Sequence, residues 1–316
     1  MSRLPLEICI LLLDAIGNDR CAGRWDDGYP RGCIHTLTAC SLVCRAWYHH
    51  TIPYLWSSLV IDAQPPLKRS KDLRLTVNRV WWESPIKRQE ATFPLAEMLN
   101  IFQSNPRLMA SIRHLCLKFS LPVKKDELMA TPELVNFCKA LPPLPRFSWE
   151  ADELDHNTIF TPSYEVPNDD DHPLGQIITS FCHSPALTAF TFSGVTFPLD
   201  ILKATPNLKD ISFTNIAECI IPHSSNHTSP LHSLPFRLRR ASFCAAECVY
   251  ESLIEFEDIF SQLEELTVNS GDHGENRAEE NLATLVSLPI GKLRTLDLEI
   301  TNSWDCESPF SQNAGL

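Results

Sequence analysis

The chain has 316 residues, 44% of them hydrophobic, and carries 27 basic against 39 acidic side chains. This length has room for one small module and one larger domain with a core of its own. No run reaches the ~18–20 consecutive apolar residues of a membrane helix, and the apolar run 8–13 is shorter than the core of a secretory signal. We therefore expect a protein of the cytosol or nucleus that does not bind a membrane.

Two apolar stretches near the N-terminus are predicted to be helices. The first follows Pro5, which suits the first turn of a helix because its missing N–H costs nothing there, and it should end near Gly17. Thr36 or Thr38 can cap the second helix, which should run to about His50. Both helices are apolar over too wide a face for one neighbour to cover. They need cover from their own chain on one side and from a partner on the other.

The same stretches resemble the F-box, a helical module that docks on an adaptor of the Skp family. The F-box pattern opens with Leu-Pro-x-Glu at residues 4–7, continues with Leu-x-x-Cys-x-x-Val-Cys-Arg-x-Trp at 37–47, and closes on a Leu-Trp pair at 55–56. The resemblance covers residues 1–62 and departs from the family in a longer connection, Asn18–His35. The adaptor-binding residues that it implies are Leu4, Pro5, Ile8, Leu42, Val43, Trp47, Leu55 and Trp56.

Residues 63–94 are expected to be a basic linker followed by a first strand, Leu73–Trp82. Residues 63–125 carry twelve basic against four acidic side chains, which could indicate a nuclear-localisation patch or a nucleic-acid contact. A nucleic-acid-binding protein usually has a broader basic field. We therefore favour a solvated linker and expect no nucleic-acid partner.

From residue 95 onward, a helical segment, a turn and a short stretch of alternating apolar residues recur. The alternating stretches begin at Leu115, Phe147, Phe190, Ile211, Ala241, Leu266 and Leu296. The last five are 21, 30, 25 and 30 residues apart. One strand and one helix per unit of this length is typical of a leucine-rich-repeat solenoid, and the unit resembles the irregular leucine-rich repeats that often follow an F-box. An ordinary α/β domain is the alternative.

The expected fold is α/β: a small N-terminal helical F-box followed, over residues 95–316, by an irregular leucine-rich-repeat-like solenoid. Alternate side chains of its strands should point to the core or to solvent. The inward set should be Leu115, Leu117, Phe190, Phe192, Ile211, Phe213, Phe243, Leu266, Val268, Leu296 and Leu298. Three polar stretches, Ala151–Pro173, Pro222–Pro235 and Ser270–Asn281, are expected to be exposed loops.

The outward side chains of these strands should form a polar ladder that turns acidic at the last strand. Such a ladder could receive a Lys/Arg-containing segment of a target protein. The candidate target-binding residues are Thr191, Ser212, Thr214, Thr267, Asn269, Asp297 and Glu299. The alternative is that these residues are merely the solvated side of a sheet.

Motifs that carry chemistry are missing from the sequence, so no catalytic residue and no cofactor are expected. There is no G-x-G-x-x-G, P-loop, G-x-S-x-G or H-E-x-x-H pattern. The twelve cysteines are dispersed and are expected to be free thiols rather than disulfides. The only candidate metal set, Cys21, Cys33 and His35, lacks the close spacing of a zinc site.

By its resemblance to F-box proteins, the chain is expected to be a non-catalytic substrate-recognition subunit of an SCF-type ubiquitin ligase. It would bind a Skp-family adaptor, and through it a cullin scaffold, with the F-box, and an unknown target with the repeat domain. The alternative is a leucine-rich-repeat scaffold that binds an adaptor without driving ubiquitination.

Overall fold

The protein is an α/β protein whose described residues fall into two compact units. The computed structural model describes residues 6–22, 31–64, 74–78, 92–119, 132–151, 164–165, 180–198, 200–203, 205–216, 219–220, 237–246, 249, 252–253, 259–270 and 292–300. Unit 1 comprises Met1–Asp155 with Pro167–Leu187, and unit 2 comprises His156–Val166 with Thr188–Leu316. No helix in the described ranges is long and apolar enough to cross a membrane.

Unit 1 joins three N-terminal helices to a mixed sheet. Its elements are α1 (Leu6–Ala22), α2 (Arg31–Ser41), α3 (Arg45–Leu55), β1 (Ser58–Gln64), β2 (Arg74–Asn78), β3 (Thr92–Pro94), α4 (Leu95–Ser104), α5 (Pro106–Met109), β4 (His114–Phe119), α7 (Pro132–Ala140) and β5 (Arg146–Ala151). The strand order is β5-β4-β1-β2-β3. Strands β5, β4 and β1 are parallel, whereas β2 and β3 are antiparallel additions beyond β1.

Helices α4 and α7 cover this sheet with one apolar face each. Leu95, Met98 and Phe102 are buried on α4, at the spacing of one helical face. The ring of Phe102 lies 5.9 Å from that of Phe137 on α7. Pro132 opens α7, where a proline costs no hydrogen bond.

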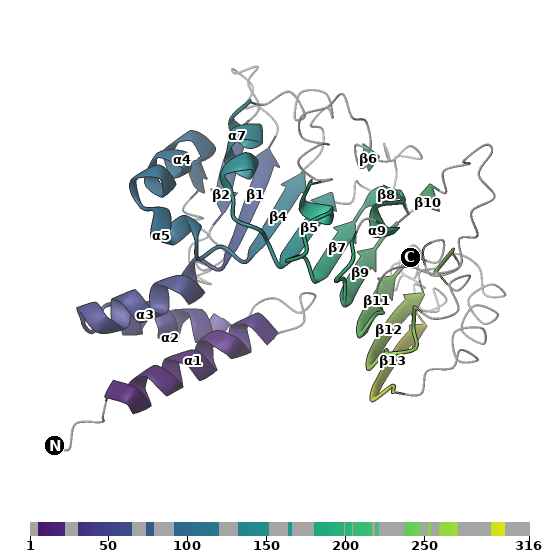
Figure 1. Ribbon diagram of the computed structural model, residues 1–316, viewed down its shortest axis with the longest axis horizontal. Coiled ribbons are helices and arrows are strands. Elements are labelled where there is room, and N and C mark those ends of the chain that lie inside the picture. Colours follow the sequence, from purple (N-terminus) through teal and green to yellow (C-terminus); the bar gives the residue numbers. More distant parts are fainter. Residues whose placement is uncertain are drawn as a thin grey trace, which may run out of the picture. The chain divides into compact units, whose positions relative to one another are not determined.

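Unit 2 is built on five parallel strands that lie side by side in the order of the chain (Figure 1). They are β7 (Ala189–Ser193), β9 (Asp210–Thr214), β11 (Arg240–Cys244), β12 (Glu265–Ser270) and β13 (Thr295–Ile300). The helix α9 (Asp200–Lys203) and a small parallel sheet accompany them. The strands of that sheet are β6 (Tyr164–Glu165), β8 (Val195–Pro198) and β10 (Cys219–Ile220).

The same backbone contacts recur at the start of successive strands in unit 2. The carbonyl of Lys209 accepts the N–H groups of Arg239 and Arg240, at 2.7 and 3.1 Å. The carbonyl of Arg239 accepts those of Glu264 and Glu265 in the same way, at 2.8 and 3.2 Å. Each strand is therefore held in one register to the strand before it.

A second recurring contact ends three of these strands. Gly194, Asn215 and Ala245 have positive φ values of 67°, 53° and 47°. Their N–H groups donate to the carbonyls of Thr214, Cys244 and Asn269, each on the next strand, at 2.8–2.9 Å. A positive φ is uncommon outside glycine. Here it recurs at the residue that directly follows each of the strands β7, β9 and β11, so the same turn ends all three strands.

The core of unit 2 contains a stack of phenylalanines. Phe192 and Phe213 are stacked with ring centroids 6.1 Å apart, and Phe213 and Phe243 follow at 6.2 Å. All three face the same side because their strands pair in register. Burial confirms the predicted inward set for Leu115, Leu117, Phe190, Phe192, Ile211, Phe213, Phe243, Leu266 and Val268.

The last two residues of that predicted inward set are exposed. Leu296 and Leu298 on β13 are 46% and 37% exposed. Leu266, the residue of β12 that pairs with Leu296, is only 2% exposed. The prediction of burial is wrong for these two residues. Among the described strands, β13 has a neighbour on one side only, so fewer side chains cover its apolar face.

Three predicted boundaries in the N-terminal part need correction. Helix α1 continues beyond Gly17 to Ala22. The single second helix is in fact two, α2 and α3, because Cys44 has an extended backbone at φ −162° and ψ 167° and caps α3. The F-box boundary at residue 62 falls inside β1, and the predicted linker contributes β2 and β3 to the sheet.

Other sequence predictions lie partly outside the described residues. Strand β2 accounts for the first part of the predicted strand Leu73–Trp82, and residues 79–82 are not described. Of the three predicted loops, Pro222–Pro235 lies wholly outside the described residues. The other two are described only at Ala151, at β6 and at Ser270.

The contrast between Leu266 and Leu296 predicts unequal costs for the same substitution. Leu266→Ala should lower the free energy of unfolding by about 2–5 kcal/mol, because it removes buried methyl groups and leaves a cavity. Leu296→Ala, at the same register on the next strand, should cost less than about 1 kcal/mol. Urea denaturation of the two variants measures both values. Equal losses would show that β13 is covered as fully as β12.

Candidate functional site

An uncovered apolar surface lies on the three N-terminal helices. Helix α1 buries Cys9 and Leu13, which are four residues apart and share a face. Its other side, and the break between α2 and α3, expose large apolar side chains. We call these the helical apolar surface: Ile8, Leu11, Leu12, Leu42, Val43 and Tyr48.

The most exposed part of this surface lies in the turn between α2 and α3. Leu42 is 82% exposed and Val43 follows it in the turn. Their N–H groups donate to the carbonyls of Ala39 and Cys40, both at 3.1 Å. The turn therefore has its own backbone hydrogen bonds, and its two apolar side chains face solvent.

The carboxylate of Asp14 ties α1 to α3 beneath this surface. The Tyr54 hydroxyl donates to Asp14 Oδ1 at 2.6 Å, and His50 Nε2 lies 2.7 Å from the same oxygen. The Tyr54 hydrogen bond and then the His50 contact hold the pKa of Asp14 below its usual value. Two partners on successive turns of α3 fix the position of α1, and with it the spacing of the exposed side chains on the two helices.

Two predicted adaptor-binding residues are part of the core instead. Leu55 and Trp56 are only 4% and 5% exposed, and the Trp56 ring packs edge-on against Phe102 of α4 at 5.6 Å. They therefore do not belong to the helical apolar surface, and their role as contact residues stays a prediction. They hold the helices to the sheet, since α3 runs directly into β1.

The other predicted adaptor-binding residues fall into three groups. Ile8, Leu42 and Val43 belong to the helical apolar surface, and Trp47 is half-buried beside it. Leu4 and Pro5 lie outside the described residues. Leu11, Leu12 and Tyr48 are exposed here but were not selected from the sequence. Because α1 is apolar almost all round, its sequence does not show which face is covered.

A buried histidine strengthens the connection between helices and sheet. His114 on β4 lies between two serines, with Nδ1 2.9 Å from Ser58 Oγ and Nε2 2.8 Å from Ser148 Oγ. The Ser57 carbonyl also accepts the His114 N–H at 2.9 Å. Burial, followed by the charge of Arg146, lowers the pKa of His114 to about 3. A neutral imidazole therefore links β1, β4 and β5 just where α3 ends.

A polar face in unit 2 is the second candidate site. Residues paired across parallel strands point to the same side, so each row can be followed by its register. One row runs Thr191, Ser212, Ser242, Thr267 and Asp297. The next row runs Ser193, Thr214, Cys244, Asn269 and Glu299.

The predicted target-binding residues therefore share one face, but they are not equally accessible. Thr191, Thr214, Thr267 and Asn269 are half-buried, and Asp297 is exposed. Ser212 is only 9% exposed, less than the other members of the set whose side chains are described. The backbone of Glu299 continues the second row, and its side chain is not among those described.

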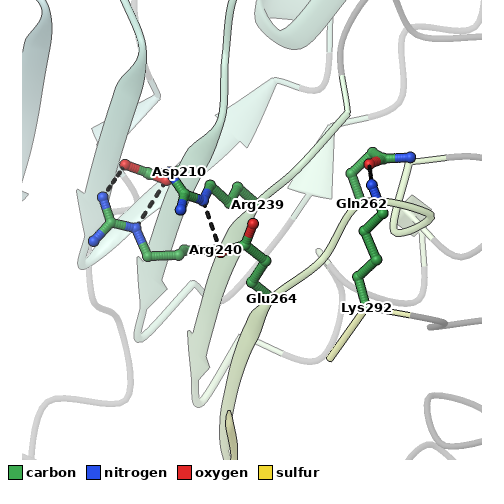
Figure 2. A network of polar contacts seen from close by, with 6 residues as sticks. All are labelled: Asp210, Arg239, Arg240, Gln262, Glu264 and Lys292. Carbon is green, nitrogen blue, oxygen red and sulfur yellow. Dashed lines mark hydrogen bonds and ion pairs between the residues drawn. The ribbon is translucent and has the colours of Figure 1, made fainter. Parts of the chain in front are cut away.

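An ion pair that the sequence did not reveal lies beside these rows. Figure 2 shows the two hydrogen bonds between Arg240 and Asp210. Arg240 Nε donates to Asp210 Oδ1 at 3.0 Å, and Arg240 Nη2 donates to Asp210 Oδ2 at 2.5 Å. This hydrogen bonding to Asp210 raises the pKa of Arg240. The pair joins β9 to β11 at one register position, so an alignment of the repeats would have placed opposite charges side by side.

A second set of polar contacts lies at the start of the strands. Arg239 Nε is 2.9 Å from Glu264 Oε2, and Lys292 Nζ donates to Gln262 Oε1 (Figure 2). The hydrogen bond from Arg239 lowers the pKa of Glu264. These contacts are partly exposed and are worth little individually.

Metal and redox chemistry find no support in the described part of the chain. It contains no group of His, Cys, Asp and Glu side chains that could hold a metal ion. The side chains of Cys21, Cys33 and His35 are outside that part. None of the seven cysteines whose side chains are described forms a disulfide, and burial raises the pKa of Cys138 to about 12.

The state of His114 predicts a specific acid sensitivity. Its pKa is near 3 when folded and about 6.5 when unfolded, so below pH 6.5 the unfolded chain binds a proton that the folded chain does not. Stability from this group is complete above pH 6.5 and falls by about 1.4 kcal/mol per pH unit towards pH 3. His114→Gln should flatten the stability profile between about pH 6.5 and 5, measured by urea denaturation. His49→Gln, at an exposed position, is the control. Equal slopes in wild type and His114→Gln would contradict the assignment.

Comparison with known proteins leaves the function to be inferred from chemistry and geometry. No protein-family model matches the sequence, and no curated protein matches it.

Proposed function

We propose that this chain is the non-catalytic substrate-recognition subunit of an SCF-type ubiquitin ligase. In this proposal, α1–α3 form an F-box that docks on a Skp-family adaptor and, through it, on a cullin scaffold. The polar face of unit 2 receives the target protein. The two halves of the proposal are supported by different observations.

The helical apolar surface is the observation that carries the proposal. Of nine large apolar side chains exposed in the described part, six lie between Ile8 and Tyr48. A soluble protein rarely exposes such a cluster unless a partner covers it. Covering a leucine side chain fully is worth about 1.5–3 kcal/mol, so Leu42, Leu11 and Leu12 alone could drive docking.

The chemistry of this surface favours an apolar helical partner over a charged one. The segment 42–46 is exposed throughout, and Arg45 is its only charged residue. The surface also includes Val43, which belongs to the F-box pattern, and Ile8 and Leu42, which the resemblance to the F-box implies as adaptor-binding residues. A Skp-family adaptor is the partner that the pattern implies.

Unit 2 supports an irregular leucine-rich-repeat-like solenoid for the second half of the proposal. Its strands follow in chain order, and the paired carbonyl contacts and left-handed turns recur from strand to strand. Recurrence of backbone geometry at intervals of 21 and 30 residues, from Gly194 to Asn215 to Ala245, is expected of stacked repeats. Such units present one continuous face to a partner.

The proposed mechanism involves no bond chemistry in this chain. Binding the adaptor and the target at the same time raises the effective concentration of the target near a ubiquitin-charged enzyme held elsewhere on the scaffold. The sheet of unit 1 holds the docking helices in a fixed position. Leu55, Trp56 and the Ser58–His114–Ser148 contacts join the docking helices to the sheet without a flexible connection.

The docking half is tested by charging the most exposed part of the surface. The double variant Leu42→Glu, Val43→Glu should stay folded, because both side chains already face solvent. Its affinity for a purified Skp-family adaptor should fall at least about 30-fold, the loss expected when interface anchors are removed. Isothermal titration calorimetry measures the affinity. Ile101→Glu, at an exposed apolar position on α4, is the matched control and should bind like wild type.

Two outcomes would count against the proposal. Wild-type chain that does not bind the adaptor would remove its basis, and unchanged binding by the folded double variant would move the contact elsewhere. Adaptor binding without any ubiquitination by the reconstituted complex, once a target is known, would favour the scaffold alternative.

A further inference from the structure

The last strand of unit 2 offers an edge that no described strand covers. Strand β13 ends the strand order and pairs with β12 alone among the described strands. An edge strand presents backbone N–H and C=O groups that another chain can pair with. Proteins usually protect a long edge with a proline, a bulge or charged side chains. Thr295–Ile300 contains no proline, and its charged residues, Asp297 and Glu299, are on one face only.

One face of β13 carries two exposed apolar side chains. Leu296 and Leu298 occupy the registers at which β12 buries Leu266 and Val268. They remain 46% and 37% exposed, and β13 is the last strand in the order of the described strands. One more strand would cover them, as β13 helps to cover the side chains of β12.

The opposite side of β13 is acidic. Asp297 is exposed there, and Glu265 is exposed on the same face of β12. An incoming strand would therefore meet negative charge on one side and apolar carbon on the other.

These two sides decide between possible occupants. Pairing β13 with β13 of a second copy would bring the Asp297 carboxylates of both copies to one face, which is unfavourable. Residues 301–316 of this chain contain two acidic and no basic side chains, so they also lack the complementary charge. A partner segment with basic side chains fits better than either.

We propose that β13 binds an extended segment of the target protein in which basic and apolar side chains alternate. Strand addition would satisfy the edge with backbone hydrogen bonds, and the alternate side chains would give specificity. With a period of two, the basic residues face Asp297 and the apolar residues cover Leu296 and Leu298. This deepens the proposed function by naming the chemistry of the target, and it rests on that function only in calling the partner a ubiquitination target.

The test uses synthetic peptides and the full chain without an adaptor. A fluorescent peptide of about nine residues, with lysine and valine alternating, is long enough to pair along the six residues of β13. A peptide of the same composition with its lysines and valines in two blocks is the control. It carries equal charge but cannot sort its side chains onto two faces. This control is needed because the protein has a formal net charge of −12 and attracts any basic peptide.

Fluorescence anisotropy should show the alternating peptide binding at least about 10-fold more tightly than the block peptide, since only the former can pair in register. Two further peptides carry N-methyl groups on one or the other alternate set of amides. One of them should lose binding, because only one set of N–H groups faces β13.

Two variants place the peptide on the edge. Asp297→Lys should weaken binding of the alternating peptide by about 3- to 10-fold, because a cross-strand attraction becomes a repulsion. Leu298→Lys should weaken it as well, by putting a charge where apolar contact is needed. The matched control is Glu133→Lys on α7, an exposed acidic position in unit 1, which should leave binding unchanged.

The inference is overturned if the block peptide binds as tightly as the alternating one, or if both N-methylated peptides bind like the parent. Equal effects of Asp297→Lys and Glu133→Lys would also overturn it, because they would indicate attraction by net charge alone. None of these results touches adaptor binding, which α1–α3 mediate in the proposal. Conversely, a chain that binds the peptide but no adaptor would refute the proposed function and leave the edge site standing.

Discussion

The register of the parallel strands is the constraint on which unit 2 depends. Side chains alternate along a strand, so a shift of one residue would send Phe192, Phe213 and Phe243 to the polar face. The carbonyl before each strand prevents this shift by accepting two N–H groups from the next. The same register that stacks the phenylalanines also aligns the hydroxyl row and the Asp210–Arg240 pair. Core and candidate binding face are thus two consequences of one backbone pattern.

In unit 1, large apolar side chains are exposed on helices that are joined firmly to a sheet. Asp14 holds α1 to α3 through Tyr54 and His50. Trp56 packs on Phe102 where the chain enters β1. The apolar residues that stabilise the module are thereby separated from those that stay open, and the two sets are neighbours in sequence.

Local patterns in the sequence placed the strands in which apolar residues alternate, but they did not predict β1, β3, β6, β8 or β10. The accessible residues depended on distant contacts. Period-two alternation predicted β4, β5, β7, β9, β11, β12 and β13, since it requires only adjacent residues. Burial of Trp56 depends on Phe102, 46 positions away, and α1 is held through Tyr54, 40 positions away. Leu296 is exposed on the last of the described strands, a position in the sheet that no repeat pattern contains. These are tertiary effects, which local patterns do not predict.

The central claim is that an adaptor covers the helical apolar surface. The most direct test is amide hydrogen exchange, compared for the chain alone and for the chain with a purified Skp-family adaptor. Protection from exchange shows where the partner binds, even if no single residue contributes much to the affinity. The account predicts slower exchange in α1, in the turn at Leu42 and Val43, and in α3, with β11 to β13 unchanged. Protection confined to unit 2, or no protection at saturating adaptor, would contradict it.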